Sequence, residues 1–347
     1  MKISRLFLLL FLVIFALAGC EGEQGPAGPA GADGTNGTDG NDGTDGSDGA
    51  NGYTPAMCLD CHNTAPDLEI QLAYATSGHK AGNYVAYAGG RASCGRCHSK
   101  QGFIEFAVMG EVSGDISDPA SIDCATCHTV HPGDFGIRLN GPVDMIFDAA
   151  KYTLDLGDNS NLCANCHQSR RAEPNITDPG TEFAITSTHY GPHHGAQANV
   201  LGGIGFAEIA GSTSYPAPGA SHLGAGMTCV TCHMGDGYAD EAGGHSWHPA
   251  IAVCQGCHAG VDDFDVNGFQ TDMQAKLDEL RDRLVVLGVV EYVDADEAYE
   301  PVVGTYPMAQ AQAFFNWIGL AEDRSMGVHN PSYFEALLDN SLEAIAE

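Results

Sequence analysis

The chain has 347 residues, of which 45 are acidic and 14 are Lys or Arg, and its formal net charge is −31 at pH 7. This balance excludes a nucleic-acid-binding protein, because that function needs a basic face. It favours solubility and attracts basic partner proteins or metal cations. Thirteen cysteines and fifteen histidines stand out in the composition.

Residues 1–19 are expected to be a targeting segment. Two basic residues precede the apolar run Leu6–Ala18, which is too short to span a bilayer and has the length of a signal-peptide core. The run leads into Leu-Ala-Gly-Cys ending at Cys20, which resembles a bacterial lipobox. By that resemblance Cys20 would be the lipidated first residue of an exported lipoprotein, and Glu21 favours the outer membrane. An ordinary signal peptide is the alternative.

Residues 25–52 carry glycine at every third position. A strict Gly-x-y period is the collagen signature, because only Gly fits at the axis of three wound chains. Only Pro26 and Pro29 support that conformation, and Asp in the later triplets would repel across chains. We therefore expect residues 20–52 to form a lipidated, collagen-like acidic stalk, in which the repeat 25–52 would be roughly 85 Å long if it is fully polyproline II. A triple helix, which would make a trimer, and calcium binding by the Asp-Gly repeats are the alternatives.

The sequence Cys-x-x-Cys-His, the attachment signature of c-type haem, occurs six times and uses twelve of the thirteen cysteines. In this signature two thioethers hold the porphyrin edge, and the His binds the iron as the proximal ligand. The predicted attachment residues are Cys58, Cys61, Cys94, Cys97, Cys124, Cys127, Cys163, Cys166, Cys229, Cys232, Cys254 and Cys257. The predicted proximal ligands are His62, His98, His128, His167, His233 and His258.

Zinc knuckles and disulfides are the alternatives for these cysteine pairs. Twelve cysteines could make three four-thiolate zinc sites, and an exported chain can oxidise its thiols. Neither alternative requires a His directly after each pair, and all six pairs have one. The sequence therefore predicts six haem c groups.

Residues 53–260 are predicted to be the hexahaem body. This segment is rich in Gly, Pro, Ser, Thr and Asn, and the motifs have no fixed spacing, which excludes a solenoid. We expect a mostly irregular, loop-rich fold with short α-helices, in which the haems supply much of the apolar core. Short helical turns are expected at the motifs, because both Cys and the His then share one face. Phe103–Met109 fits either a helix or a strand.

Residues 261–347 have a helical pattern instead. Apolar residues recur at helical spacing from Phe269 to Leu287, and Met308–Leu320 is a second candidate helix. A third is expected from Pro331 at its first position, with Asn330 as the N-cap. We expect these helices to pack on the haem body. A small independent helical domain is the alternative, although His329 argues against it.

Nine histidines lie outside the motifs, enough to give six haems a second, distal imidazole. His131 follows the proximal His128 by only three residues. It cannot easily reach the opposite face of the same haem, because the porphyrin plane lies between. We therefore expect His131 to bind a neighbouring haem and to bring two macrocycles close together.

Several phrases make residues 53–347 resemble the bacterial multihaem c-type cytochromes, including the outer-surface cytochromes of extracellular electron transfer. These are SGHK, THYGPHHGAQANVLGG, SHLGAGMTCVTCHM, GGHSWHP and DRSMGVHNPSYFEALL. The resemblance implies His79, His131, His222, His245 and His329 as distal ligands. The sixth is His193 or His194, and His194 is favoured. His189 and His248 are expected not to be ligands, and Met234 is expected to serve packing.

If each of the six irons has two imidazole ligands, no position is left for a substrate. The chain would then be an electron conduit rather than an enzyme. The resemblance implies an outer-membrane lipoprotein at the cell surface. Its redox partners would be other cytochromes or extracellular acceptors such as metal oxides, chelates and quinones. One alternative is a reductase of nitrite, hydroxylamine or sulfite with one open haem and a spare His as acid or base. The other is a subunit of a cytochrome filament.

Overall fold

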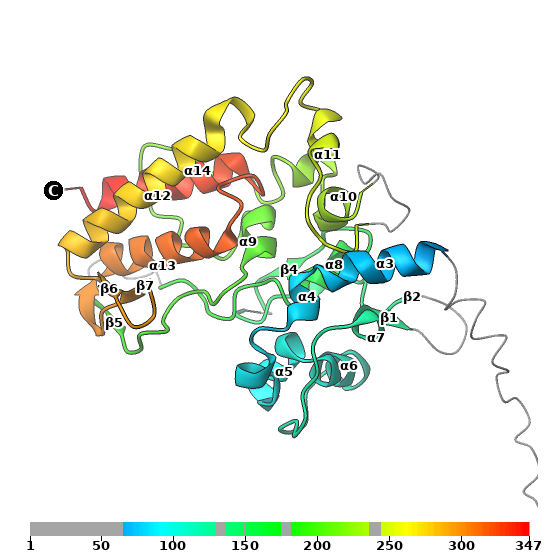
Figure 1. Cartoon of the computed structure of the whole chain (residues 1–347). Coiled ribbons are helices and arrows are strands. Elements are labelled where there is room, and N and C mark those ends of the chain that lie inside the picture. Colours follow the sequence, from blue (N-terminus) through cyan, green and yellow to red (C-terminus); the bar gives the residue numbers. More distant parts are fainter. Residues whose placement is uncertain (1–64, 130–135, 149, 175–181, 236–243, 347) are drawn as a thin grey trace, which may run out of the picture. The chain divides into compact units, whose positions relative to one another are not determined.

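The computed structural model describes residues 65–346 except 130–135, 149, 175–181 and 236–243 (Figure 1). The chain divides into two units, residues 1–53 and 54–347, and all the described residues belong to the second. Five predicted features lie outside the described residues. They are the targeting segment, Cys20, the Gly-x-y repeat, the motif Cys58–His62 and His131.

Short helices and two-stranded ladders make up the first half of the described chain. The helices there are α3 (Ala65–Ala75), α4 (Gly78–Ala81), η1 (Val85–Gly89), α5 (Ala92–His98), α6 (Lys100–Met109), α7 (Cys124–Cys127) and α8 (Ser160–Ala164). The antiparallel pairs are β1 (His128–Thr129) with β2 (Gly136–Ile137), and β3 (Val143–Asp144) with β4 (Thr153–Leu154). The predicted loop-rich fold with short helices is confirmed for these residues.

The described haem motifs lie on helical turns, as predicted. The helices α5 and α10 (Cys229–His233) carry two whole motifs, and α7 carries the two cysteines of a third, whose His128 begins β1. The other two motifs begin in α8 and in α11 (Ile251–Gln255). The segment Phe103–Met109 is helical and belongs to α6. Ser99 begins this helix by accepting a hydrogen bond from the backbone of Gly102 at 3.2 Å. A Cβ at Gly102 would lie 2.4 Å from the backbone of Gly95, so glycine lets α6 lie against the haem motif on α5.

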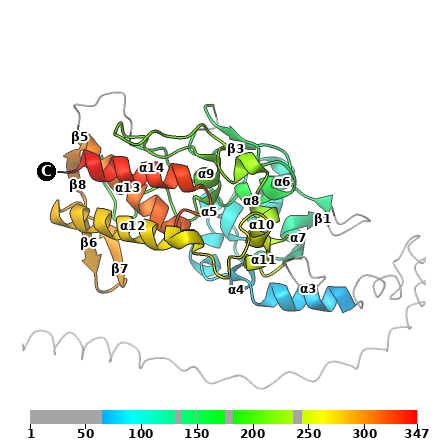
Figure 2. The same ribbon diagram turned by 90° about the horizontal axis from the view of Figure 1, so that it is seen from above.

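Three long helices form the C-terminal part, and each matches a prediction. They are α12 (Phe269–Val286), α13 (Met308–Asp323) and α14 (Pro331–Ala344), and all three pack against one another (Figure 2). Asn330 caps α14, and its side chain accepts from the backbone of Tyr333. Three further short helices precede these long helices in the sequence: α9 (Gln197–Gly202), η2 (Leu223–Ala225) and η3 (Val266–Gly268).

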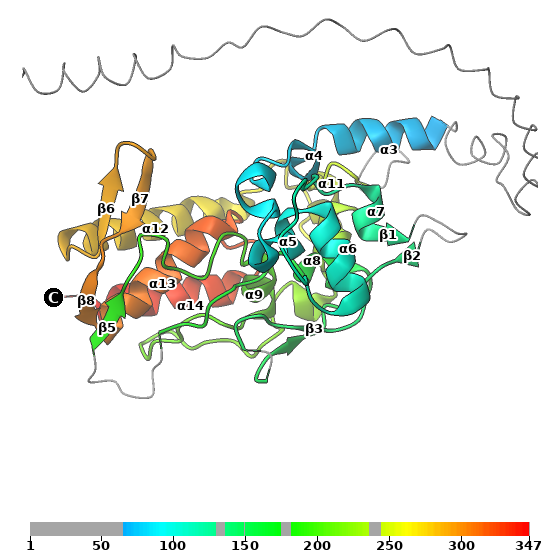
Figure 3. The same ribbon diagram turned by 90° about the horizontal axis from the view of Figure 1, so that it is seen from below.

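Two strand pairs at one end of these helices were not predicted (Figure 3). β6 (Val290–Val293) and β7 (Ala298–Pro301) form a hairpin. β8 (Gly304–Pro307) pairs antiparallel with β5 (Glu182–Ile185), which comes from the expected haem body. This long-range pairing ties the start of α13 to the middle of the chain.

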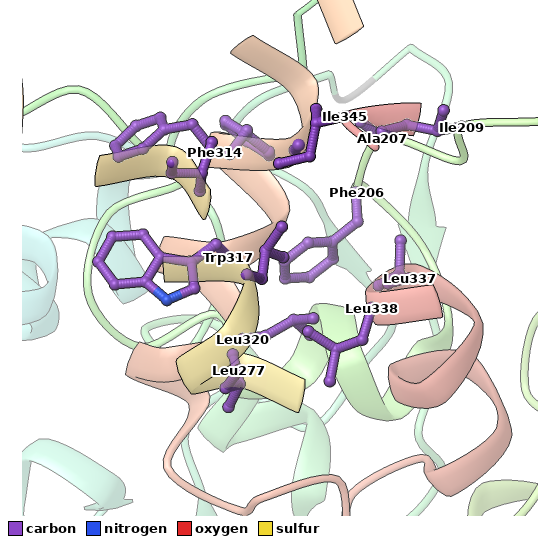
Figure 4. Packing of buried hydrophobic residues seen from close by; sticks show 14 of the residues in the cluster. Phe206, Ala207, Ile209, Leu277, Phe314, Trp317, Leu320, Leu337, Leu338 and Ile345 are labelled. Atoms are coloured by element: carbon purple, nitrogen blue, oxygen red, sulfur yellow. The ribbon is translucent and has the colours of Figure 1, made fainter. Parts of the chain in front are cut away.

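The main hydrophobic core joins the C-terminal helices to the segment 183–209. Leu280 of α12, Phe314 of α13 and Leu337 of α14 are fully buried in it. Phe206, from the middle of the chain, packs among α13 and α14 (Figure 4). Asn316 of α13 both donates to and accepts from the backbone of Ala207, at 2.8 and 2.9 Å. The three helices therefore share one core with part of the expected haem body.

A smaller core lies under the loop-rich part. Met145 and Leu154, from the β3–β4 region, pack there with Ala164, Ala198 and Leu201. Within the residues that the structure describes, no helix is long and apolar enough to cross a membrane.

Candidate haem-binding site

The described haem motifs line one continuous cavity of about 1810 Å³. Its walls include nine of the ten described motif cysteines, all five described motif histidines and six further histidines. A site for one small ligand has a volume of about 300–1,000 Å³, so this cavity is suited to several ligands or to very large ones. His189 and His248 are not among its lining residues.

Inside the cavity, each of the five described motif histidines faces a histidine from outside the motifs. The ring centroids of the five pairs are 6.1–6.4 Å apart. The pairs are His98 with His193, His128 with His245, His167 with His79, His233 with His329, and His258 with His222.

This spacing fits two imidazoles on opposite sides of one metal ion. A metal–nitrogen bond is about 2 Å long, and a five-membered ring with bonds of about 1.33 Å has its centre about 1.1 Å from each atom. Two bonds and two such radii place the ring centres about 6.3 Å apart. The interplanar angles range from 28° to 81°. Each ring can turn about its own metal–nitrogen bond, so all of these angles are compatible with axial ligation.

Four non-motif histidines of the expected distal set occupy these paired positions: His79, His222, His245 and His329. The fifth paired position differs from the expectation, because His193 and not His194 faces His98. The Nδ1 atom of His194 lies 2.5 Å from a carboxylate oxygen of Glu322, and its side chain is 77% exposed. His193 has a left-handed backbone, with φ of 79°, and the ring centroids of His193 and His194 lie 5.2 Å apart.

Hydrogen bonds from an earlier segment of the chain hold the backbone next to His193. The carbonyl oxygen of Pro192 accepts from the backbone N–H of Arg170 at 2.8 Å and from the hydroxyl of Ser169 at 3.0 Å. These two residues follow His167 closely in the chain. Residues next to one motif histidine therefore hold the backbone of the histidine that faces another motif histidine, His98.

Hydrogen bonds orient four of the paired rings. Each places Nδ1 against an acceptor oxygen, so Nδ1 carries the proton and Nε2 is left to bind a metal. The contacts are His167 to Oε1 of Gln197 at 3.1 Å, His222 to the carbonyl of Val328 at 2.6 Å, His233 to the carbonyl of Trp247 at 2.7 Å, and His329 to Oδ1 of Asp323 at 2.7 Å. Sequence reasoning missed these acceptors, since nothing in their local pattern marks them.

Burial favours the neutral form of two of the paired histidines from outside the motifs. It lowers the pKa of His79 to about 4, and the charge of nearby His167 acts in the same direction. It also lowers the pKa of His193 to about 4, with a further contribution from Arg170. The neutral imidazole is the form that binds a metal, so neither ring has to lose a proton at neutral pH.

The motifs touch one another. Sγ of Cys97 lies 3.8 Å from the carbonyl oxygen of Asn165, and Sγ of Cys166 lies 3.8 Å from the carbonyl oxygen of Arg96. The backbone N–H of Val230, in the fifth motif of the chain, donates to Ser160 at the start of α8 at 3.0 Å. The helices α10 and α11 also pack together. The motifs that begin at residues 94, 163, 229 and 254 thus form one contiguous row.

The described motif residues fit c-type haem. The ten described motif cysteines are free thiols, as thioether formation requires. Each of the five opposed histidine pairs could supply two nitrogen ligands to one iron. Zinc knuckles and disulfides explain neither the pairs nor their common spacing.

No protein-family model and no curated protein matches the chain. Among solved structures, it is similar to the crystal structure of the outer cell wall cytochrome OcwA, with a TM-score of 0.49 and 18% sequence identity. The match covers 80% of this chain and 50% of that one, so the chain spans about half the length of that protein.

Proposed function

We propose that the chain is a hexahaem c-type cytochrome that transfers electrons. The observation that carries this proposal is the set of five opposed histidine pairs, one for each described Cys-x-x-Cys-His motif. When bound, each haem would supply a one-electron iron couple, held at a lower potential by two imidazoles than by His and Met.

The residues of the chain would bind the haems and would give each iron two protein ligands. Two cysteines of each motif would attach the haem, and the motif histidine would bind its iron. The opposed histidine would be the second protein ligand and would exclude water and substrates from the iron. His193 takes this role opposite His98. The row of touching motifs brings neighbouring attachment sites together, which favours electron transfer between them.

The sixth site belongs to the same proposal. Cys58 and Cys61 would attach the haem, and His62 would bind its iron. His131 completes the proposed distal set, either at this iron or at another. The alternative, a reductase, would need an open iron, and each of the five described motifs faces a second histidine.

We further propose that the protein is exported and works at the cell surface. Lipidation at Cys20 would anchor it to the outer membrane, and the Gly-x-y stalk would hold the haem body away from the lipid. Its partners would be other cytochromes or extracellular acceptors such as metal oxides, chelates and quinones. The Gly-x-y repeat also allows a trimer, and cleavage beyond the stalk would allow a filament.

Two measurements on the purified protein test the core of the proposal. Mass spectrometry should show six covalent haem additions, and a haem-free zinc protein would contradict the proposal. The visible spectrum of the dithionite-reduced protein should not change with carbon monoxide, since every iron has two protein ligands. A Soret shift of about one sixth of the amplitude would mean one open iron. Nitrite, hydroxylamine and sulfite would then be tested as substrates.

A further inference from the structure

Asp323 is a buried carboxylate in direct contact with a proposed iron ligand. It is the last residue of α13, and its side chain is fully buried. Its Oδ1 atom lies 2.7 Å from Nδ1 of His329, and its Oδ2 atom accepts a hydrogen bond from the hydroxyl of Ser325. Since both neighbours donate to it, Asp323 serves as an acceptor on both oxygens, which is the bonding pattern of an ionised carboxylate.

The charge of this acceptor distinguishes it from the other acceptors described above. His222 and His233 donate to neutral backbone carbonyls, and His167 donates to the neutral side-chain amide of Gln197. The position of the ring is fixed in all four cases. At His329 alone among these four, the fixing group also carries a full negative charge.

We propose that Asp323 is a positioning residue that lowers the reduction potential of the haem bound between His233 and His329. This inference rests on the proposed function. A carboxylate that accepts from Nδ1–H makes the imidazole a stronger donor at Nε2. A stronger donor stabilises Fe(III) relative to Fe(II), and hydrogen bonding around the ligands is one of the means by which proteins set haem potentials. Burial strengthens the effect, because little water screens the charge.

The surroundings of Asp323 hold this contact in place. Nε2 of Gln197 lies 3.4 Å from the backbone carbonyl oxygen of Asp323, and Oε1 of the same amide accepts from His167. Gln197 therefore links the segment that carries Asp323 to a ligand of a second haem site. The two sites differ in the charge beside the ligand, a carboxylate at one and an amide at the other, and this difference can be exchanged by substitution.

The first test is a spectroelectrochemical titration of Asp323→Asn. The amide can still accept from His329, so the ring keeps its orientation while the charge is lost. The reduction equilibrium of one haem in six should shift at least tenfold towards Fe(II), which is about 59 mV upwards for a one-electron couple. The other five components should not move. The electron paramagnetic resonance spectrum of the oxidised protein should show one altered low-spin signal.

Two further variants complete the test. Ser325→Ala keeps the carboxylate beside His329 and should shift the same component much less. Gln197→Glu places a carboxylate beside His167 and should move a different component downwards. If Asp323→Asn does not bind six haems, Gln197→Glu decides: a downward shift supports the proposal and an unchanged titration overturns it.

The inference is also overturned if Asp323→Asn binds six haems and titrates like the wild type. An equal upward shift in Ser325→Ala overturns it as well, because loosening of the turn would then explain the effect. Failure of the proposed function gives a different result, since the wild-type protein would then lack six haems.

Discussion

Arg96 and Asn165 are hydrogen-bonded across two haem motifs, with Nη2 of the arginine 3.1 Å from Oδ1 of the asparagine. Each residue directly precedes the second cysteine of its own motif. The guanidinium also lies over the ring of Phe106, with Cζ 3.7 Å from the centroid, and burial lowers its pKa. This side chain is therefore held between α6 and a motif that lies 69 residues away in the chain.

Substitution of this pair should show an energetic coupling between the two motifs. Asn165→Ala leaves a partly buried guanidinium with one partner fewer and should lower the free energy of unfolding by about 1–3 kcal/mol. Combined with Arg96→Met, it should give a coupling energy of about 0.5–3 kcal/mol in a double-mutant cycle measured by urea unfolding. The control is Arg91→Met, an exposed arginine over Tyr87, which should cost less than about 1 kcal/mol. Strict additivity would mean that the contact contributes nothing.

Replacing His193 and His194 separately should distinguish the proposed ligand from its neighbour. His193→Ala removes the ring that faces His98, so carbon monoxide should bind the reduced protein with about one sixth of the full Soret change. His194→Ala removes an exposed ring that contacts Glu322 and should leave the spectrum insensitive to carbon monoxide. The reverse pattern would assign the ligand to His194.

The difference between these two histidines explains why the sequence left the choice open. Adjacent residues in an irregular turn have no periodicity to indicate which side chain points inwards. The turn is set by Arg170 and Ser169, which lie more than twenty residues earlier in the chain. The same limit applies to Gln197 and Asp323, whose roles follow from contacts that only the folded chain creates.

Other features were predictable because their signals are local. The Cys-x-x-Cys-His spacing marks five described motifs that do line one cavity, and the helical periodicity correctly predicts α12, α13 and α14. The pairing of β5 with β8 joins residues more than one hundred positions apart, and each strand has only four residues. Such short strands carry too few residues for an alternation pattern to indicate them.

The haem-free chain should lose the structure around the cavity. Without haem, the cavity of about 1810 Å³, which histidine and cysteine side chains line, would be filled by water. The segments around it would then lose the apolar contacts that the haems would supply. Hydrogen-exchange mass spectrometry on protein made without haem attachment should therefore show loss of protection in α5, α8 and α10. The α12–α14 core, which is packed with side chains, should keep more protection. Equal protection of α5, α8 and α10 in the two forms would contradict this prediction.

Asn330 connects the stability of α14 to the ligand beside it. This side chain is fully buried, caps α14 at Tyr333 and donates to the carbonyl oxygen of Leu201 at 3.3 Å. Asn330→Ala removes both bonds, so it should lower the free energy of unfolding by about 2–4 kcal/mol. Asn330→Ser keeps a capping oxygen but loses the donor to Leu201, so it should cost about 1–3 kcal/mol.

Urea unfolding followed by far-ultraviolet circular dichroism measures both of these costs. Because His329 directly precedes Asn330, Asn330→Ala should also bind carbon monoxide at lower urea concentrations than the wild type does. If Asn330→Ser and Asn330→Ala are equally destabilised, the cap makes no contribution. If carbon monoxide begins to bind the variant and the wild type at the same urea concentration, the position of His329 does not depend on the Asn330 side chain.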